Sequence, residues 1–224
     1  MAKNYGQYCP VAHALELVGE RWSLLVVREL LGGPKRYTDL AGALPGIGTN
    51  ILANRLRELE TAGVIEKRRL PPPAAANVYA LTAYGEELRE PLYALGRWGA
   101  RSLGPPTAKD SLAPGWLVNA VRATCRSCST DKIYELHIDD EAVTARFENQ
   151  ELIVESGTSP DADTVIETDP ATLFCIASGQ TPIGEAVKTK ALKVTGDQTE
   201  AERFLSLFSF DDRPREPSRE LEHV

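Results

Sequence analysis

Residues 1–103 alternate between short amphipathic stretches and turns that contain glycine or proline. Apolar residues recur every three or four positions over residues 11–19 and 22–31, and the second stretch ends at Gly32-Gly33-Pro34. Glycine lacks a side chain and proline lacks the backbone donor, so this tripeptide stops a helix. The spacing therefore predicts two helices over these residues.

A helix-turn-helix is predicted from the stretch that follows. Residues 38–44 form a short helical segment with Thr38 as its N-cap, and the turn at 45–48 contains two glycines. Thr49 is expected to cap a longer helix that runs through Thr61. A short helix, a glycine-containing turn and a second helix in this order are the sequence form of a helix-turn-helix.

The second helix of that pair has an apolar and a polar face. Its apolar face is expected to hold Leu56, Leu59 and either Ile51 or Leu52. Its outer face carries small and polar side chains and one arginine: Thr49, Asn50, Ala53, Asn54 and Arg57. Asparagine pairs bidentately with adenine and arginine with guanine, each worth about 1–3 kcal/mol of discrimination. This face favours base reading in a DNA major groove. The alternative is an inert packing unit with a solvated polar face.

A hairpin and a long helix complete this half of the chain. Residues 64–70 and 78–81 read as strands, and a hairpin directly after a recognition helix is a wing. The run Lys67-Arg68-Arg69 can contact phosphates or enter a minor groove. The helix is predicted from the N-cap Thr82 to about residue 103, with a kink or break at Pro91. Its apolar side exceeds what a local core needs, which predicts a dimer-forming surface.

A second domain with a different period is predicted over residues 115–210, after a linker at 104–114 that is rich in proline and glycine. It opens with a helix at 115–123. The apolar period then changes to two, and this alternation predicts five short strands at 133–138, 142–147, 151–155, 164–168 and 192–194. Further helices are predicted at 170–178 (with Asp169 as N-cap), 183–188 and 199–208.

The predicted fold class is therefore α+β. A winged helix-turn-helix domain over 1–103 is followed by an α+β sandwich with an antiparallel five-stranded sheet. The charged tail over 211–224 is predicted to be disordered.

The net charge is informative about a DNA partner only when the two halves of the chain are counted separately. The 224 residues hold 25 Lys and Arg against 32 Asp and Glu, a net charge of -7 that taken alone argues against a nucleic-acid partner. Residues 1–103 carry 13 basic and 10 acidic side chains, whereas residues 104–224 carry 12 and 22. A mildly basic half thus precedes an acidic one, and only the local field at a binding face matters.

Residues 5–103 contain several separately spaced motifs. They are Cys9-Pro10-Val11, the stretch 14–23, Arg36-Tyr37-Thr38-Asp39-Leu40, the stretches 55–60 and 62–65, Tyr79-Ala80-Leu81-Thr82 with Gly85, and Trp98-Gly99. Together they resemble the HxlR-type family of winged-helix bacterial transcription regulators. The resemblance implies a homodimer on double-stranded DNA, with the 49–61 helix in the major groove and the wing beside it. The residues expected to contact DNA are Arg36, Thr49, Asn50, Asn54, Arg55, Arg57, Lys67, Arg68 and Arg69.

Cys9 is a candidate redox sensor because some members of that family sense electrophiles or oxidants through a cysteine at this place. A thiol near a helix N-terminus has its thiolate stabilised. The alternative is that Cys9 is a small buried apolar residue.

The second half carries a looser set of motifs: the stretch 163–170, Leu173, Gly179, Ala186 and the stretch 192–197. They resemble the sterol-carrier-protein-like lipid-binding fold, which implies a cavity for an apolar small-molecule effector. The expected lining residues are Trp116, Phe147, Leu173, Phe174, Ile176, Ile183, Val187 and Phe204. The alternative is that these side chains fill an ordinary core.

Catalytic and metal-binding patterns are not found in the sequence. Cys125 and Cys128 form a single C-x-x-C pair without the further ligands that zinc needs, and the three histidines are scattered. We therefore expect no enzyme activity, cofactor or metal. The start of the chain has no export signal and no apolar run is long enough to cross a bilayer, which predicts a cytoplasmic protein without a membrane partner. The sequence favours a ligand-responsive DNA-binding regulator. The rival is a lipid or small-molecule carrier, or an enzyme domain, whose N-terminal half only dimerises.

Overall fold

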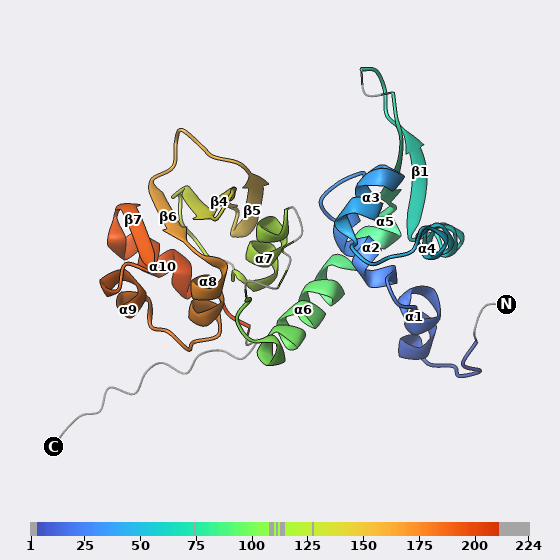
Figure 1. Cartoon of the computed structure of the whole chain (residues 1–224), viewed down its shortest axis with the longest axis horizontal. Coiled ribbons are helices and arrows are strands. Elements are labelled where there is room, and N and C mark those ends of the chain that lie inside the picture. The colour runs from blue at the N-terminus through green and yellow to red at the C-terminus, as the bar shows by residue number, and fades with distance from the viewer. Residues whose placement is uncertain are drawn as a thin grey trace. The chain divides into compact units, whose positions relative to one another are not determined.

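The computed structural model describes residues 4–73, 75–107, 110, 112, 115–126 and 128–210, and it separates into two compact units (Figure 1). Unit 1 comprises Met1–Ala94 with Leu112–Pro114, and unit 2 comprises Leu95–Ser111 with Gly115–Val224. The predicted disordered tail at 211–224 lies outside the described residues, as does part of the predicted linker at 104–114.

Unit 1 is a helical domain with a two-stranded wing. Its elements are α1 (Pro10–Val18), α2 (Ser23–Leu30), α3 (Tyr37–Ala43), α4 (Thr49–Thr61), β1 (Ile65–Arg69), β2 (Asn77–Leu81), α5 (Ala83–Glu86) and the start of α6 (Arg89–Leu103). The strands β1 and β2 pair in antiparallel fashion from Ile65↔Leu81 to Arg69↔Asn77. This order of helix, turn, helix and hairpin confirms the predicted winged helix-turn-helix.

The core of unit 1 decides which apolar residue of α4 faces inward. Leu52, Leu56 and Leu59 are fully buried, whereas Ile51 is exposed. The inward face therefore contains Leu52 rather than Ile51, because Leu52, Leu56 and Leu59 recur at intervals of four and three residues.

Two of the predicted N-caps in unit 1 are wrong, Thr38 by two residues and Thr49 by one. The helix α3 begins at Tyr37, and the Arg36 backbone N–H, at its N-cap position, donates to Asp39 Oδ2 at 2.9 Å. The helix α4 begins at Thr49 itself, with Gly48 at the N-cap position. In α3 a carboxylate three residues into the helix satisfies the backbone donor, so the threonine hydroxyl is not needed there.

The predicted break near Pro91 is confirmed. The helix α5 ends at Glu86 and α6 starts at Arg89, which places Pro91 in the first turn of α6. A proline is tolerated in the first turn because the backbone donors there have no partner within the helix. Thr82 is confirmed as the N-cap of α5, because its side chain accepts a hydrogen bond from Gly85 N.

Unit 2 is a five-stranded sheet with helices packed on it. Its elements after α6 are α7 (Trp116–Thr124), β3 (Tyr134–Ile138), β4 (Glu141–Glu148), β5 (Glu151–Ser156), β6 (Thr164–Thr168), α8 (Pro170–Ala177), α9 (Ile183–Lys188), β7 (Leu192–Gly196) and α10 (Gln198–Ser206). Asp169 is the N-cap of α8, as predicted, and accepts from Thr172 N. The helix α7 packs on β4 and β5, and α10 packs on β6 and β7.

The sheet is mixed rather than purely antiparallel, so the predicted sheet type is corrected. Its strand order is β5-β4-β3-β6-β7, and β3 pairs with β6 in parallel from Tyr134↔Thr164 to Ile138↔Thr168. The other three pairings are antiparallel. The strands β4 and β5 extend the sheet on one side of β3, and the chain then returns to pair on the other side. A strand period of two reveals each strand but not its neighbour.

The core of unit 2 is rich in aromatic side chains. Tyr134 and Phe204 stack with their ring centroids 4.3 Å apart, and Phe208 meets Phe204 edge-on at 5.2 Å. All three side chains are buried. Aromatic pairs in these geometries add about 0.5–1.5 kcal/mol beyond their buried area. In the described part of the chain, no helix is both long and apolar enough to cross a bilayer.

Candidate DNA interface and effector core

The outward face of α4 presents the predicted base-reading residues to solvent. Thr49, Asn50, Asn54 and Arg57 are all exposed. Arg57 Nη1 donates to Asn54 Oδ1 at 3.0 Å, so these two side chains form one polar pair one helical turn apart. An amide and a guanidinium together offer the donors and the acceptor that base edges in a major groove require.

Tyr37 helps to position α4, a role that its place in the sequence does not predict. Its hydroxyl donates to the Thr49 carbonyl oxygen at 2.9 Å and so ties the start of α3 to the start of α4. Beneath the helix, its three leucines are buried in the core of unit 1. A tyrosine twelve residues before the recognition helix carries no local signal, because its role depends on the tertiary fold.

Arg55 differs from the other predicted DNA contacts. Its side chain is only 14% exposed, and its Nη1 lies 2.5 Å from Glu58 Oε2 and 3.7 Å from Glu20 Oε2. The pair with Glu58 lies within α4, and the pair with Glu20 links α4 to the turn between α1 and α2. The geometry gives Arg55 a positioning role inside unit 1 rather than a place on the outer face.

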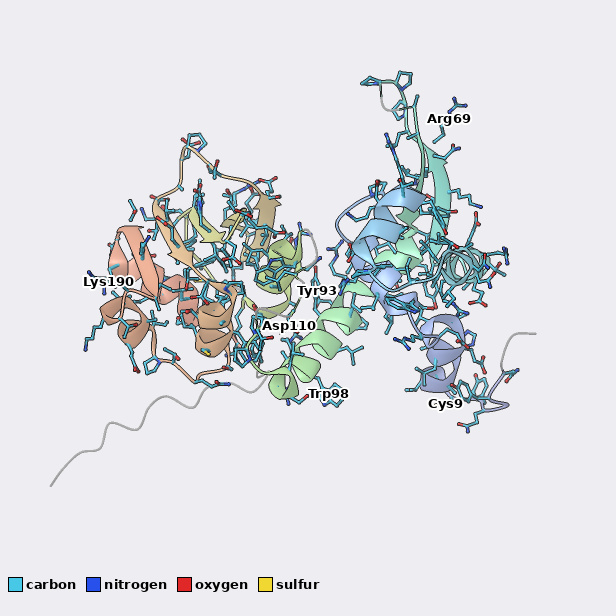
Figure 2. All side chains as sticks on the ribbon, viewed as in Figure 1. Cys9, Arg69, Tyr93, Trp98, Asp110 and Lys190 are labelled. Carbon is cyan, nitrogen blue, oxygen red and sulfur yellow. The ribbon has the colours of Figure 1, made fainter. Side chains whose placement is uncertain are left out.

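The wing carries its positive charges on the exposed end of β1. Lys67 Nζ lies 3.2 Å from Glu60 Oε2 and over the Tyr79 ring, and Arg68 Nε lies 2.5 Å from Glu66 Oε1. Arg69 is exposed at the end of β1, near the tip of the hairpin (Figure 2). Arg36 is also exposed, immediately before α3.

Close contacts of Thr82 and Gly85 with residues 63–64 fix the base of the wing. Thr82 Oγ1 lies 2.6 Å from the Gly63 carbonyl oxygen and 3.2 Å from that of Val64, and it accepts from Gly85 N at 3.1 Å. A Cβ added at Gly85 would lie 2.0 Å from the Val64 carbonyl oxygen. Only a glycine therefore allows α5 to pack this closely against the start of the wing.

Two helices present large apolar side chains to solvent. Next to α1, Tyr8 is fully exposed, and Val11 and Leu15 on α1 are exposed as well. On α6, Trp98 is 67% exposed and Leu103 78% exposed (Figure 2). Cys9 lies at the N-cap position of α1 and is half-buried.

Seven of the eight predicted lining residues of the effector site lie in or against the single apolar core of unit 2. Phe147, Leu173, Ile176 and Phe204 are buried members of that core, and Trp116, Ile183 and Val187 pack against it. Phe174 is half-buried and contacts the Phe210 ring at a centroid distance of 5.0 Å. The structure thus places these side chains together along the inner face of the sheet and its helices.

Two arginines attach the C-terminal half of α6 to α7 and to the segment after α10. Arg97 Nη1 donates to the Ala123 carbonyl oxygen at 2.8 Å, and Arg101 Nε donates to the Phe210 carbonyl oxygen at 3.2 Å. Both acceptors belong to the same unit as these arginines. The two contacts therefore hold this part of α6 against α7 and against the segment after α10.

The opposite face of the sheet holds a buried carboxylate. Glu135 accepts hydrogen bonds from the His137 ring and from Ser159 N, the latter at 2.7 Å. Burial by itself raises the pKa of Glu135, but these hydrogen bonds and the charge of His137 outweigh it and hold the pKa below its usual value. Among the described residues, no group of three or more His, Cys, Asp or Glu side chains could hold a metal ion.

Comparisons with known proteins match the two halves of the chain to two different families. Residues 17–106 match the HxlR-like helix-turn-helix family, and residues 124–209 match the SCP-2 sterol transfer family. An HTH-type transcriptional regulator of Synechocystis sp. is 39% identical over 110 residues, which cover 49% of this chain and 82% of that relative. The HTH-type transcriptional regulator YodB of Bacillus subtilis is 33% identical over 98 residues, which cover 43% of this chain and 88% of YodB. The solved reduced form of YodB covers 45% of this chain and 100% of its own, with 31% identity and a TM-score of 0.39.

Proposed function

The chain belongs to the HxlR-like helix-turn-helix family of transcriptional regulators and carries an SCP-2 domain, and from this premise we propose that it binds operator DNA as a homodimer whose affinity is set by an apolar small molecule in unit 2. The observation that carries the proposal is the exposed Asn54–Arg57 pair on α4, the second helix of the helix-turn-helix. Such a regulator would act in the cytoplasm, where its operator lies.

The DNA contacts divide into two kinds. The outer face of α4 reads bases through Asn50, Asn54 and Arg57, while Arg36 and the basic strand β1 contact phosphates. The net positive charge of residues 1–103 supports this division. Phosphate contacts give affinity that falls with salt, whereas the base contacts give selectivity.

Homodimer formation is supported by the exposed apolar side chains on and beside α1 and on the C-terminal half of α6. Side chains such as Val11 and Trp98 gain free energy when a second copy covers them, at about 25 cal/mol per Å2 of apolar area. A symmetric dimer would also place two α4 helices about one turn of DNA apart, as winged helix-turn-helix regulators require. Val11→Asp combined with Leu15→Asp should shift the chain toward monomer in analytical ultracentrifugation.

The effector is proposed to be an apolar molecule, of which a sterol or a fatty acid is the natural first test because the domain resembles sterol transfer proteins. It would enter between the sheet and the helices, among side chains such as Phe147, Ile176 and Phe204. Arg97 and Arg101 then connect the change in unit 2 to α6. A ligand shifts DNA affinity only as far as it binds the two states differently.

A second sensing site is proposed at Cys9. Its position at the N-cap of α1, beside the apolar dimer face, means that modification of its thiol would disturb that face. Treatment with diamide or methylglyoxal should weaken operator binding by the wild type and not by Cys9→Ser. Unchanged binding of the treated wild type in a gel-shift assay would exclude this site.

Fluorescence anisotropy with the DNA upstream of the gene tests the main proposal. We expect sequence-selective, salt-dependent binding that is lost in the Asn54→Ala/Arg57→Ala variant and changed when a fatty acid or sterol is added. The rival function is a carrier or enzyme domain that uses unit 1 only to dimerise. That rival predicts ligand uptake with no selective DNA binding, and native mass spectrometry of the purified protein would reveal a co-purified ligand.

A further inference from the structure

Two cysteines lie together where α7 ends and the chain meets α10. Cys125 is at the C-cap position of α7 and forms an isolated bridge with Phe208, and Cys128 follows three residues later. Both thiols are free, half-buried and packed against the core of unit 2. Three residues is a spacing that a turn can close into a disulfide.

The two thiols have different surroundings. Burial, and after it the charge of the neighbouring Cys128, raise the pKa of the Cys125 thiol to about 12. Cys128 Sγ lies 3.8 Å from Arg203 Nη2 on α10, and the same nitrogen donates to the Ser129 carbonyl oxygen at 3.3 Å. The second contact holds the guanidinium beside the sulfur.

A guanidinium at this distance stabilises a thiolate, and the thiolate is the reactive form of cysteine. The same contact acts on Arg203, because the pKa of Arg203 is raised first by the charge of Cys128 and then by that of Glu200. Cys128 is thus placed to attack, and Cys125 to act as the resolving thiol.

We propose that Cys125 and Cys128 form a reversible dithiol–disulfide site in the SCP-2 domain that reacts with hydroperoxides, with Cys128 attacking first. The Cys128 thiolate attacks the terminal oxygen of the hydroperoxide, the O–O bond breaks, and a sulfenic acid and an alcohol form. Cys125 then attacks Cys128 Sγ while its proton passes to the departing hydroxide, the S–S bond forms, and water leaves. In total two thiols and one hydroperoxide give one disulfide, one alcohol and one water, a two-electron oxidation.

The disulfide would form close to the contact between α6 and α7. Cys125 is two residues from Ala123, whose carbonyl oxygen accepts from Arg97, and Ser209 N donates to the intervening Thr124 carbonyl oxygen at 3.0 Å. Closing the bond draws Cys128 toward α7 and away from Arg203. Whether this alters DNA affinity rests on the proposed function, but the chemistry of the site does not.

The test uses the full-length Cys9→Ser/Cys175→Ser protein, in which only the proposed pair remains. Under titration with hydrogen peroxide we expect both thiols to disappear, the intact mass to fall by about 2 Da as two hydrogens are lost, and dithiothreitol to reverse both changes. The chain should run as a monomer on a non-reducing gel. Adding Cys125→Ser should instead leave a sulfenic acid on Cys128 that dimedone traps.

Arg203→Met tests the assignment of roles. We expect it to slow the reaction of Cys128 with peroxide by about fivefold or more, because the charge that stabilises the thiolate is gone. Arg146→Met is the matched control, since it removes a charge from β4 where Arg146 contacts Glu148 and Glu155. A circular dichroism spectrum and melting curve verify that each variant is folded.

Three results would overturn the proposal. In the first, both thiols persist at peroxide concentrations that oxidise free cysteine. In the second, the protein with both cysteines gains oxygen but loses no hydrogen. In the third, Cys128 reacts with peroxide at the same rate with Arg203 and with Arg203→Met. Anisotropy on the same samples is a separate readout. A disulfide that forms in a protein without selective DNA binding would contradict the regulator but not the dithiol site.

Discussion

The two units differ in how many of their aromatic side chains are buried and in the sign of their net charge, although Tyr93 of unit 1 is buried and Trp98 of unit 2 is exposed. In unit 2, Tyr134, Phe204 and Phe208 stack on one another and are buried. In unit 1, Tyr5, Tyr8 and Tyr84 are exposed. Charge follows the same division, since residues 1–103 are mildly basic and residues 104–224 are strongly acidic.

The difference suggests that the exposed surfaces of unit 1 bind partners, whereas the apolar core of unit 2 is suited to surround a ligand. Unit 1 presents polar side chains on α4, basic side chains on the wing and apolar side chains on α1, each suited to a different partner. Unit 2 gathers its buried apolar side chains in one cluster, although Trp98 and Leu103 on α6 are exposed, and its acidic surface disfavours DNA. The predictions below test whether the two units are as separate as this comparison implies.

The largest effect is expected for Gly85→Ala in unit 1. The added Cβ would lie 2.0 Å from the Val64 carbonyl oxygen, so α5 must move away from β1 and the Thr82 cap is lost. We expect the free energy of unfolding of unit 1 to fall by about 3 kcal/mol or more, since backbone atoms cannot move as easily as a side chain. Urea unfolding followed by circular dichroism measures this change.

Gly42→Ala is the matched control. Gly42 lies in α3 with no atom within 4 Å of the added Cβ, so alanine should stabilise the helix by about 0.5–1 kcal/mol. The unfolding of unit 2 should be unchanged in both variants. A shift of both units together in Gly85→Ala would mean that the chain unfolds as one cooperative body.

Local chemistry in the sequence predicts much of the fold, and its failures are informative. Thr82 and Asp169 are N-caps as expected, because each begins a helix directly after a strand and has no stronger competitor nearby. Thr38 fails because the Asp39 carboxylate satisfies the donor instead. The parallel pairing of β3 with β6 could not be predicted, since it depends on where the chain goes between residues 139 and 163.

The candidate sites show the same limit. The exposed face of α4 follows from a helical period, so Asn54 and Arg57 could be placed on one face from sequence alone. The ion pair of Arg55 with Glu20 could not be predicted, because Glu20 is distant in sequence, whereas its pair with Glu58 follows from helical spacing. The contact between Arg203 and Cys128 joins residues 75 positions apart and is equally invisible in the sequence.

The second prediction concerns base reading by α4. Asn54→Ala and Arg57→Ala should each weaken binding to the selected operator by about 1–3 kcal/mol and should relax sequence selectivity. Removing both should leave only non-specific binding. Anisotropy titrations against operator and scrambled DNA measure the ratio. Arg146→Ala, which removes an arginine from unit 2, should leave both affinities unchanged, and a loss there would break the division of labour between the units.

A third prediction concerns acid stability and belongs to unit 2. The pKa of Glu135 is held below its ordinary value of 4.5, so its charged form stabilises the folded state above that value. This stabilisation is lost as the pH falls through the folded-state pKa. We expect Glu135→Gln to destabilise unit 2 at pH 7 by about 1–3 kcal/mol, the cost of a charged hydrogen bond. The variant should also flatten the loss of stability below pH 4.5.

Glu148→Gln is the control for that experiment. Glu148 is exposed on β4, so its replacement leaves the buried Glu135 carboxylate and its two donors in place. Thermal melts between pH 3 and pH 7 should retain the wild-type profile in this variant. An identical profile for Glu135→Gln and the wild type would show that the His137 and Ser159 contacts do not stabilise the sheet.

The smallest effect is expected on the wing. Arg69→Ala removes one exposed charge at the end of β1, and Lys67→Ala removes one that is shared with Glu60. If Arg69 contacts a phosphate, its loss should reduce the slope of log affinity against log salt by about 1 and weaken all DNA sequences alike. Lys67→Ala should change the slope less, because Glu60 already neutralises part of its charge and must release it on binding. Equal slopes in wild type and Arg69→Ala would show that the wing does not contact DNA phosphates. The basic contacts of unit 1 with DNA would then have to come from α4 and Arg36.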